Sequence, residues 1–138
     1  MGKKVGGYYD DVASAIYLDK TGNILITGNF AGTSDFNPGA ATNNLATSSS
    51  NNPDIFILKL DTAGNYIWAR SLSGASTSDA GLTIASDDQG NVYTGELLGE
   101  PLISIRIRNS EYYRNWRYRR IHLEIKCFRC LYMGLQNR

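Results

Sequence analysis

The chain contains the same short turn motif, Asp-x-x-Gly-Asn, three times, beginning at Asp19, Asp61 and Asp87. Each copy follows a segment rich in β-branched and aromatic residues, and another such segment comes after it. Aspartate accepts hydrogen bonds from the backbone two residues further on, and glycine readily adopts the left-handed conformation of a tight turn. The motif therefore predicts three β-hairpins.

The segments around the first two turns define the expected strands. We expect residues 12–18 to pair with residues 23–30, and residues 54–60 to pair with residues 65–72. Residues 12–18 are apolar or small on both alternating faces, a pattern typical of a strand packed between two layers. The connection between these hairpins is rich in turn residues, and Leu45 is expected to anchor a short extra strand within it.

The third turn begins a second copy of the pattern. Asp87 lies 68 residues after Asp19, and Ile84 lies the same distance after Ile16. The repeating unit is thus two hairpins, or four strands, which is the composition of one β-propeller blade.

A single unit of this kind cannot bury both of its faces. We therefore expect an isolated chain to aggregate or fold poorly, with its apolar faces partly exposed to water. The residues concerned are Ile16, Leu18, Ile24, Ile26, Phe56 and Ile57.

Five strings in the order found here resemble the β-propeller repeats of secreted bacterial proteins, called SBBP repeats. They are Asp19-x-x-Gly22-Asn23, residues 26–33 (ITGNFAGT), residues 35–39 (DFNPG), Asp54-Ile-Phe-x-x-Lys59-Leu and Trp68-Ala. The resemblance covers residues 1 to about 95. It implies an all-β fold of antiparallel hairpins, with one full four-stranded blade and part of a second.

The resemblance also implies a role. Members are large extracellular or cell-surface proteins, described by their repeats without an assigned reaction. The expected function is a non-catalytic structural or binding module, with neighbouring blades and an extracellular ligand of unknown identity as partners. No stretch approaches eighteen consecutive apolar residues, so no membrane span is expected, and the first residues lack the apolar segment of a signal peptide.

The charge distribution divides the chain near residue 98. Residues 1–98 carry a net charge of −5, whereas residues 99–138 carry +6 and contain eight of the nine arginines, both cysteines and the only histidine. Two regions are therefore predicted: a propeller-repeat fragment, residues 1–98, with a unit of about 68 residues, and an irregular basic tail, residues 99–138.

The tail resembles the same repeat translated in a shifted reading frame. Any Met-Gly pair is encoded ATGGGN, which contains a tryptophan codon one base later, and Met133-Gly134 lies where the repeat requires Trp-Ala. Permitted codons for residues from about 109 to 138 extend this shift into a run with the D-x-F-x-x-K-L string, a Ser-Gly turn and I-W-A. The other shifted frame converts residues from about 95 to 108 into a match for residues 28–40.

The tail also contains patterns associated with binding. Residues 106–120 interleave arginines with aromatic rings, as nucleic-acid-binding segments do, because cations neutralise phosphates and rings stack on bases. The rings are those of Tyr112, Tyr113, Trp116 and Tyr118. A shifted frame accounts for the same residues without any partner, so a nucleic acid is the less favoured alternative.

Cys127 and Cys130 have the spacing of half a zinc site or of a redox pair, with His122 as the only other soft ligand nearby. A structural zinc site normally needs four ligands, so no metal is expected.

The repeat region offers few chemical candidates. The pairs Asp10-Asp11 and Asp87-Asp88 suit acid–base chemistry or a cation, but such residues more often cap turns and strand ends. The aromatic side chains of Phe56, Tyr66 and Trp68 suit either a ligand platform or packing within a blade. We therefore assign no catalytic, cofactor-binding or metal residue and expect no enzyme. The alternative is a piece of a propeller enzyme whose site needs other blades.

Overall fold

The computed structural model describes residues 2–47, 49–72, 79–98 and 100–107, and these residues form antiparallel strands and no helix. The central sheet has four strands in the order β2-β3-β6-β7. They are β2 (Val12–Leu18), β3 (Ile24–Phe30), β6 (Asp54–Leu60) and β7 (Tyr66–Leu72). The all-β class and the first two predicted hairpins are confirmed.

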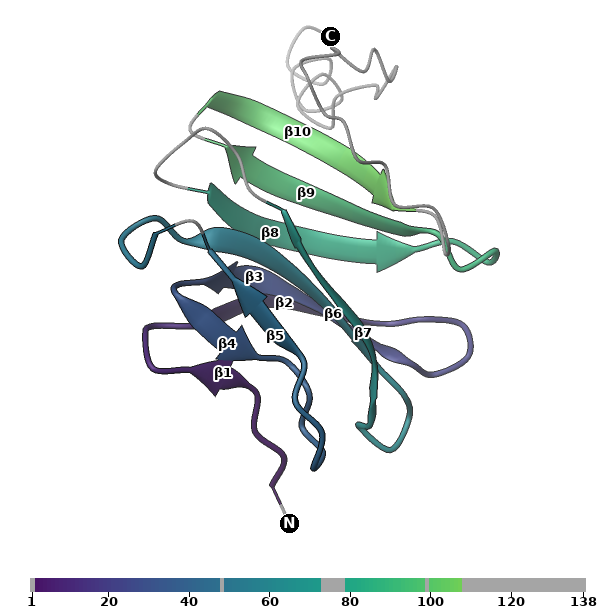
Figure 1. Ribbon diagram of the computed structural model, residues 1–138. Coiled ribbons are helices and arrows are strands. Elements are labelled where there is room, and N and C mark those ends of the chain that lie inside the picture. Colours follow the sequence, from purple (N-terminus) through teal and green to yellow (C-terminus); the bar gives the residue numbers. More distant parts are fainter. Residues whose placement is uncertain (1, 48, 73–78, 99, 108–138) are drawn as a thin grey trace, which may run out of the picture.

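Two three-stranded sheets flank the central one, and Figure 1 shows them as further layers. The smaller contains β1 (Gly6–Gly7), β4 (Thr33–Asp35) and β5 (Asn44–Ala46). The other, in the order β10-β9-β8, contains β8 (Asp79–Ser86), β9 (Val92–Leu98) and β10 (Glu100–Ile107). The third hairpin and the short strand at Leu45 are thereby confirmed.

The start of the basic tail differs from expectation. Residues 100–107, predicted to be irregular, form β10, which pairs with β9 as an antiparallel strand. Arg106 pairs with Tyr93 in this register, so the strand continues beyond the change in charge. The tail from residue 108 on, including the rest of the segment 106–120, lies outside the described residues.

The central sheet has two faces, which strand alternation fixes. Face 1 carries Ile16, Leu18, Ile24, Ile26, Phe30, Phe56 and Leu58. Face 2 carries Leu25, Thr27, Ile55, Ile57 and Lys59.

Aromatic packing covers one part of face 1. Phe36, from the segment between β4 and β5, packs against Phe30 with ring centroids 5.3 Å apart and against Phe56 at 4.9 Å. Leu45 of β5 joins the same cluster. The loop-rich connection predicted from the sequence is therefore a cover for the central strands.

The second unit covers face 2. Ile84 of β8 and Val92 of β9 form one buried cluster with Leu25 and Ile57. Figure 1 shows the sheet β8-β9-β10 lying against the central sheet on this side.

Two burial predictions are wrong, in opposite directions. Phe56 and Ile57, expected to be partly exposed, are buried because the chain supplies covers for both faces. Residues 12–18, expected between two layers, instead form an exposed edge strand, in which Ile16 is 69% and Leu18 63% exposed. The aromatic cover reaches the central strands but leaves β2 open, as was expected for Ile16 and Leu18.

The two units pack closely against each other at Gly81 in β8. A methyl group at this position would meet the Thr27 hydroxyl, and would lie 3.1 Å from both the Gly28 amide nitrogen and the Ile55 side chain. Thr27 is itself held by donating a hydrogen bond of 2.9 Å to the Phe56 carbonyl. Any side chain at this position would therefore displace the Thr27 hydroxyl from its hydrogen bond or push the two sheets apart.

Replacing Gly81 with alanine is expected to destabilise the protein by about 1–3 kcal/mol, the usual cost of overpacking. Urea denaturation measures this change. Gly2→Ala is the control, because nothing lies within 4 Å of the methyl group that it adds. Equal stability of the two variants would contradict the close packing of the sheets.

Candidate functional site

The three Asp-x-x-Gly-Asn turns have the same set of hydrogen bonds. In the first, Asp19 Oδ1 accepts from the backbone amides of Thr21 and Asn23, both at 2.9 Å, and Oδ2 accepts from Asn23 Nδ2 at 3.0 Å. The turns at Asp61 and Asp87 repeat these bonds at 2.6–3.0 Å. The glycine of each turn has a positive φ of 74–83°, so the predicted turn chemistry is confirmed.

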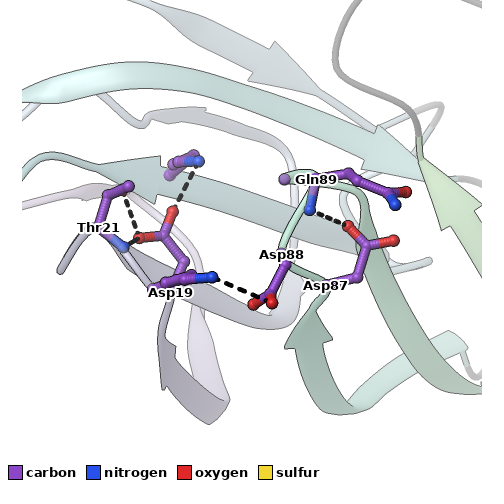
Figure 2. A pocket seen from close by; sticks show the side chains of 8 residues that line it. Asp19, Thr21, Asp87, Asp88 and Gln89 are labelled. Carbon is purple, nitrogen blue, oxygen red and sulfur yellow. Dashed lines mark hydrogen bonds and ion pairs between the residues drawn. The ribbon is translucent and has the colours of Figure 1, made fainter.

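The first and third turns lie side by side and line a pocket of about 240 Å³. Figure 2 shows Asp19 and Thr21 on one side and Asp87, Asp88 and Gln89 on the other. Equivalent turns of two successive units therefore meet at this pocket. We take it as the candidate site.

An ion pair links the two turns. Lys20 Nζ lies 3.1 Å from Asp88 Oδ2, and the two residues occupy the same position of the motif in successive units. Both side chains are exposed, so water and salt weaken the attraction. The pair therefore contributes little to stability, and its main interest is that it joins equivalent positions of the two units.

A second ion pair is buried. Lys59 Nζ lies 2.9 Å from Asp19 Oδ2, and only 10% and 7% of the two side chains are exposed. Lys59 belongs to β6, so the pair connects the β2–β3 turn to the next strand of the central sheet. The sequence analysis assigned no role to Lys59, although a lysine within an apolar strand is a signal for a buried partner.

These contacts set the acidity of the turn carboxylates. Burial raises the pKa of Asp19, but hydrogen bonds from Lys59, Thr21 and Asn23 outweigh it, so the pKa lies well below its usual value. For Asp87, the hydrogen bond from the Asn91 side chain is the largest cause and lowers the pKa to about 2. A carboxylate of such low pKa is a poor proton acceptor at neutral pH. The carboxylates of the turns are thus better suited to holding the turn backbone in place than to acid–base catalysis.

The other paired carboxylates also serve structure. Asp11 accepts hydrogen bonds from the Gly7 amide at 2.7 Å and the Ser34 hydroxyl at 2.9 Å, and so joins β1 to β4. Asp88 forms the ion pair with Lys20 described above. Their positions at turns and strand ends agree with the capping interpretation.

The aromatic candidates do not form one platform. Phe56 and Tyr66 pack in the cluster on face 1, whereas Trp68 packs in the cluster on face 2. The Arg70 guanidinium lies 6.0 Å from the centre of the Trp68 ring. The three rings belong to two packing layers, and the interpretation as packing is the one that fits.

One buried pair of acidic residues was missed by the sequence analysis. Asp54 and Asp79 are both buried, and burial together with the charge of Asp79 raises the pKa of Asp54. They lie at strand starts far apart in the chain, so no local pattern brings them together.

Within the described ranges, no group of three or more His, Cys, Asp or Glu side chains is arranged to hold a metal ion. No helix there is long and apolar enough to cross a membrane. His122, Cys127 and Cys130 lie outside the described residues.

Comparison of the chain with protein-family models, with curated proteins and with solved structures finds no match. The resemblance to SBBP repeats therefore depends on the residues of this chain alone.

We expect Asp19→Ala to destabilise the protein more than Asp61→Ala, which removes the same turn bonds without a buried lysine. The free energy of unfolding should fall by about 3 kcal/mol in Asp19→Ala. This is the low end of the usual cost of breaking a buried ion pair, because the pair lines an open pocket. The double variant Asp19→Ala/Lys59→Met should be more stable than Asp19→Ala alone, since no unpaired buried charge remains. Urea denaturation of the four proteins, wild type included, tests this. A double variant no more stable than Asp19→Ala would contradict it.

The lowered pKa of Asp87 predicts a pH dependence. A carboxyl that is more acidic in the folded state stabilises the protein above its unfolded pKa of about 4, and this contribution falls as the pH drops towards 2. The stability difference between wild type and Asp87→Asn should therefore be largest near neutral pH and shrink on acidification. Denaturation curves across this range measure it.

Asp54→Asn is the contrasting control, since the pKa of Asp54 is raised. The ionised Asp54 side chain costs stability, so this variant should gain relative to wild type as the pH rises. A difference independent of pH for either variant would refute the corresponding assignment.

Proposed function

We propose that the chain is a non-catalytic repeat module from a larger secreted or cell-surface bacterial β-propeller protein, in which repeats stack and present loops for binding. One observation carries this proposal. Ile84 and Val92 of the second unit, which are equivalent to Ile16 and Ile24 of the first, pack against Leu25 and Ile57.

This packing has a direction. The face of the second unit that corresponds to face 1 lies against face 2 of the first unit. In a series of head-to-tail contacts each unit offers a different face to each neighbour, and the series closes into a ring where the rotation permits. The arrangement suits a propeller of several blades.

The chemistry of the turns supports a scaffold over a catalyst. Asp19, Asp61 and Asp87 have their carboxylates occupied by turn hydrogen bonds, and their pKa values are lowered. A propeller enzyme would need further acids or histidines from other blades, which remains the alternative.

Sequencing of the DNA on both sides of the coding region tests the proposal. We expect further copies of the Asp-x-x-Gly-Asn hairpins at intervals of about 68 codons, and two small insertions or deletions whose correction restores the repeat within residues 96–138. Flanks without such copies would refute membership in a larger repeat protein.

A further inference from the structure

The edge of the central sheet exposes an apolar surface. Ile16 and Leu18 of β2 are largely exposed, and their partners in the register, Ile26 and Ile24, are half-buried. These four residues, all on face 1, are called the β2 surface. Isolated exposed apolar side chains are common, but a contiguous group of them marks an interaction site.

The second unit shows what covers such a surface. The positions equivalent to Ile16 and Ile24 are Ile84 and Val92, which are 5% and 1% exposed. They are buried because they lie against face 2 of the preceding unit, at Leu25 and Ile57. The same positions are thus buried in the second unit, whereas in the first unit Ile16 is exposed and Ile24 is half-buried. In the second unit the cover is an outer face, face 2 of the preceding unit.

The chain carries such an outer face itself. Strand alternation places Thr83, Ala85 and Tyr93 on the side of the second unit opposite to Ile84. Thr83 and Ala85 are exposed and Tyr93 is half-buried. These three residues, called the β8 surface, are equivalent to Ala15, Tyr17 and Leu25 of face 2.

Charge at the adjoining turns is compatible with the same contact. Within the chain, Lys20 of the first unit meets Asp88 of the second. If the second unit of one copy preceded the first unit of the next, the residues facing each other would again be an aspartate and a lysine. The aspartate would then belong to the preceding unit and the lysine to the following one, the reverse of the contact within the chain, but the two charges would still be opposite.

We propose that the β2 surface binds the β8 surface of a second copy of this chain, so that copies associate head to tail. The inference rests on the proposed function, because it extends the contact between units to separate molecules. The two surfaces differ, so each bound copy leaves one of each kind open. Association then continues beyond a dimer unless a ring closes.

Sedimentation velocity of the full chain over a range of concentrations tests the proposal. We expect the mass to rise with concentration beyond that of a dimer. Ile16→Asp, which blocks the β2 surface, and Ala85→Asp, which blocks the β8 surface, should each weaken association on the order of 100-fold, because an unpaired charge would be buried. Tyr8→Asp is the control, since it changes an exposed ring outside both surfaces.

A mixture of the two blocked variants separates directed binding from general aggregation. Each variant keeps the surface that the other lacks, so the mixture should form a one-to-one dimer that does not extend. Circular dichroism checks folding, and Leu18→Lys replaces Ile16→Asp should the latter fail to fold. A monomeric wild type, or association that neither substitution weakens, would overturn the proposal.

The outcome is distinguishable from failure of the proposed function. Flanking repeats with a monomeric chain would overturn only the self-association. Specific head-to-tail association with no flanking repeats would instead overturn only the membership in a larger propeller.

Discussion

The aspartate that opens each turn is the constraint on which the rest of the fold depends. Its two oxygens accept hydrogen bonds from the turn's backbone amides and from the side chain of the final asparagine, and these bonds fix where each hairpin reverses direction. Side chains alternate along a strand, so a shift of one residue at the turn would exchange Leu25 with Ile26 between the two faces. The turn thus decides which residues meet the aromatic cover and which meet the second unit.

Local features could be predicted from the sequence because their causes are local. The hairpins and the short strand at Leu45 follow from turn residues and alternation within a few positions. Burial could not be predicted as well, because it depends on distant segments. Phe36 comes from a loop-rich connection and Ile84 from the next unit, and together they bury Phe56 and Ile57, two of the residues expected to be partly exposed.

The candidate site shows the same division. Asp19 and Asp87 were predicted as turn residues, whereas Lys59 and the Asp54–Asp79 pair were missed because their contacts join separate strands. The register shift at Lys59 and Leu60 also places Tyr66 and Trp68 in different packing layers, although a spacing of two residues alone predicts the same face. The family resemblance and the functional role remain predictions from the residues.

The contact between Lys20 and Asp88 joins equivalent positions of neighbouring units. An array of identical repeat units would bring two lysines or two aspartates together there, and like charges repel. Adjacent units within one chain are therefore expected to diverge at this position. Such divergence would also limit mispairing between neighbours while a newly made polypeptide folds, a known hazard of tandem arrays.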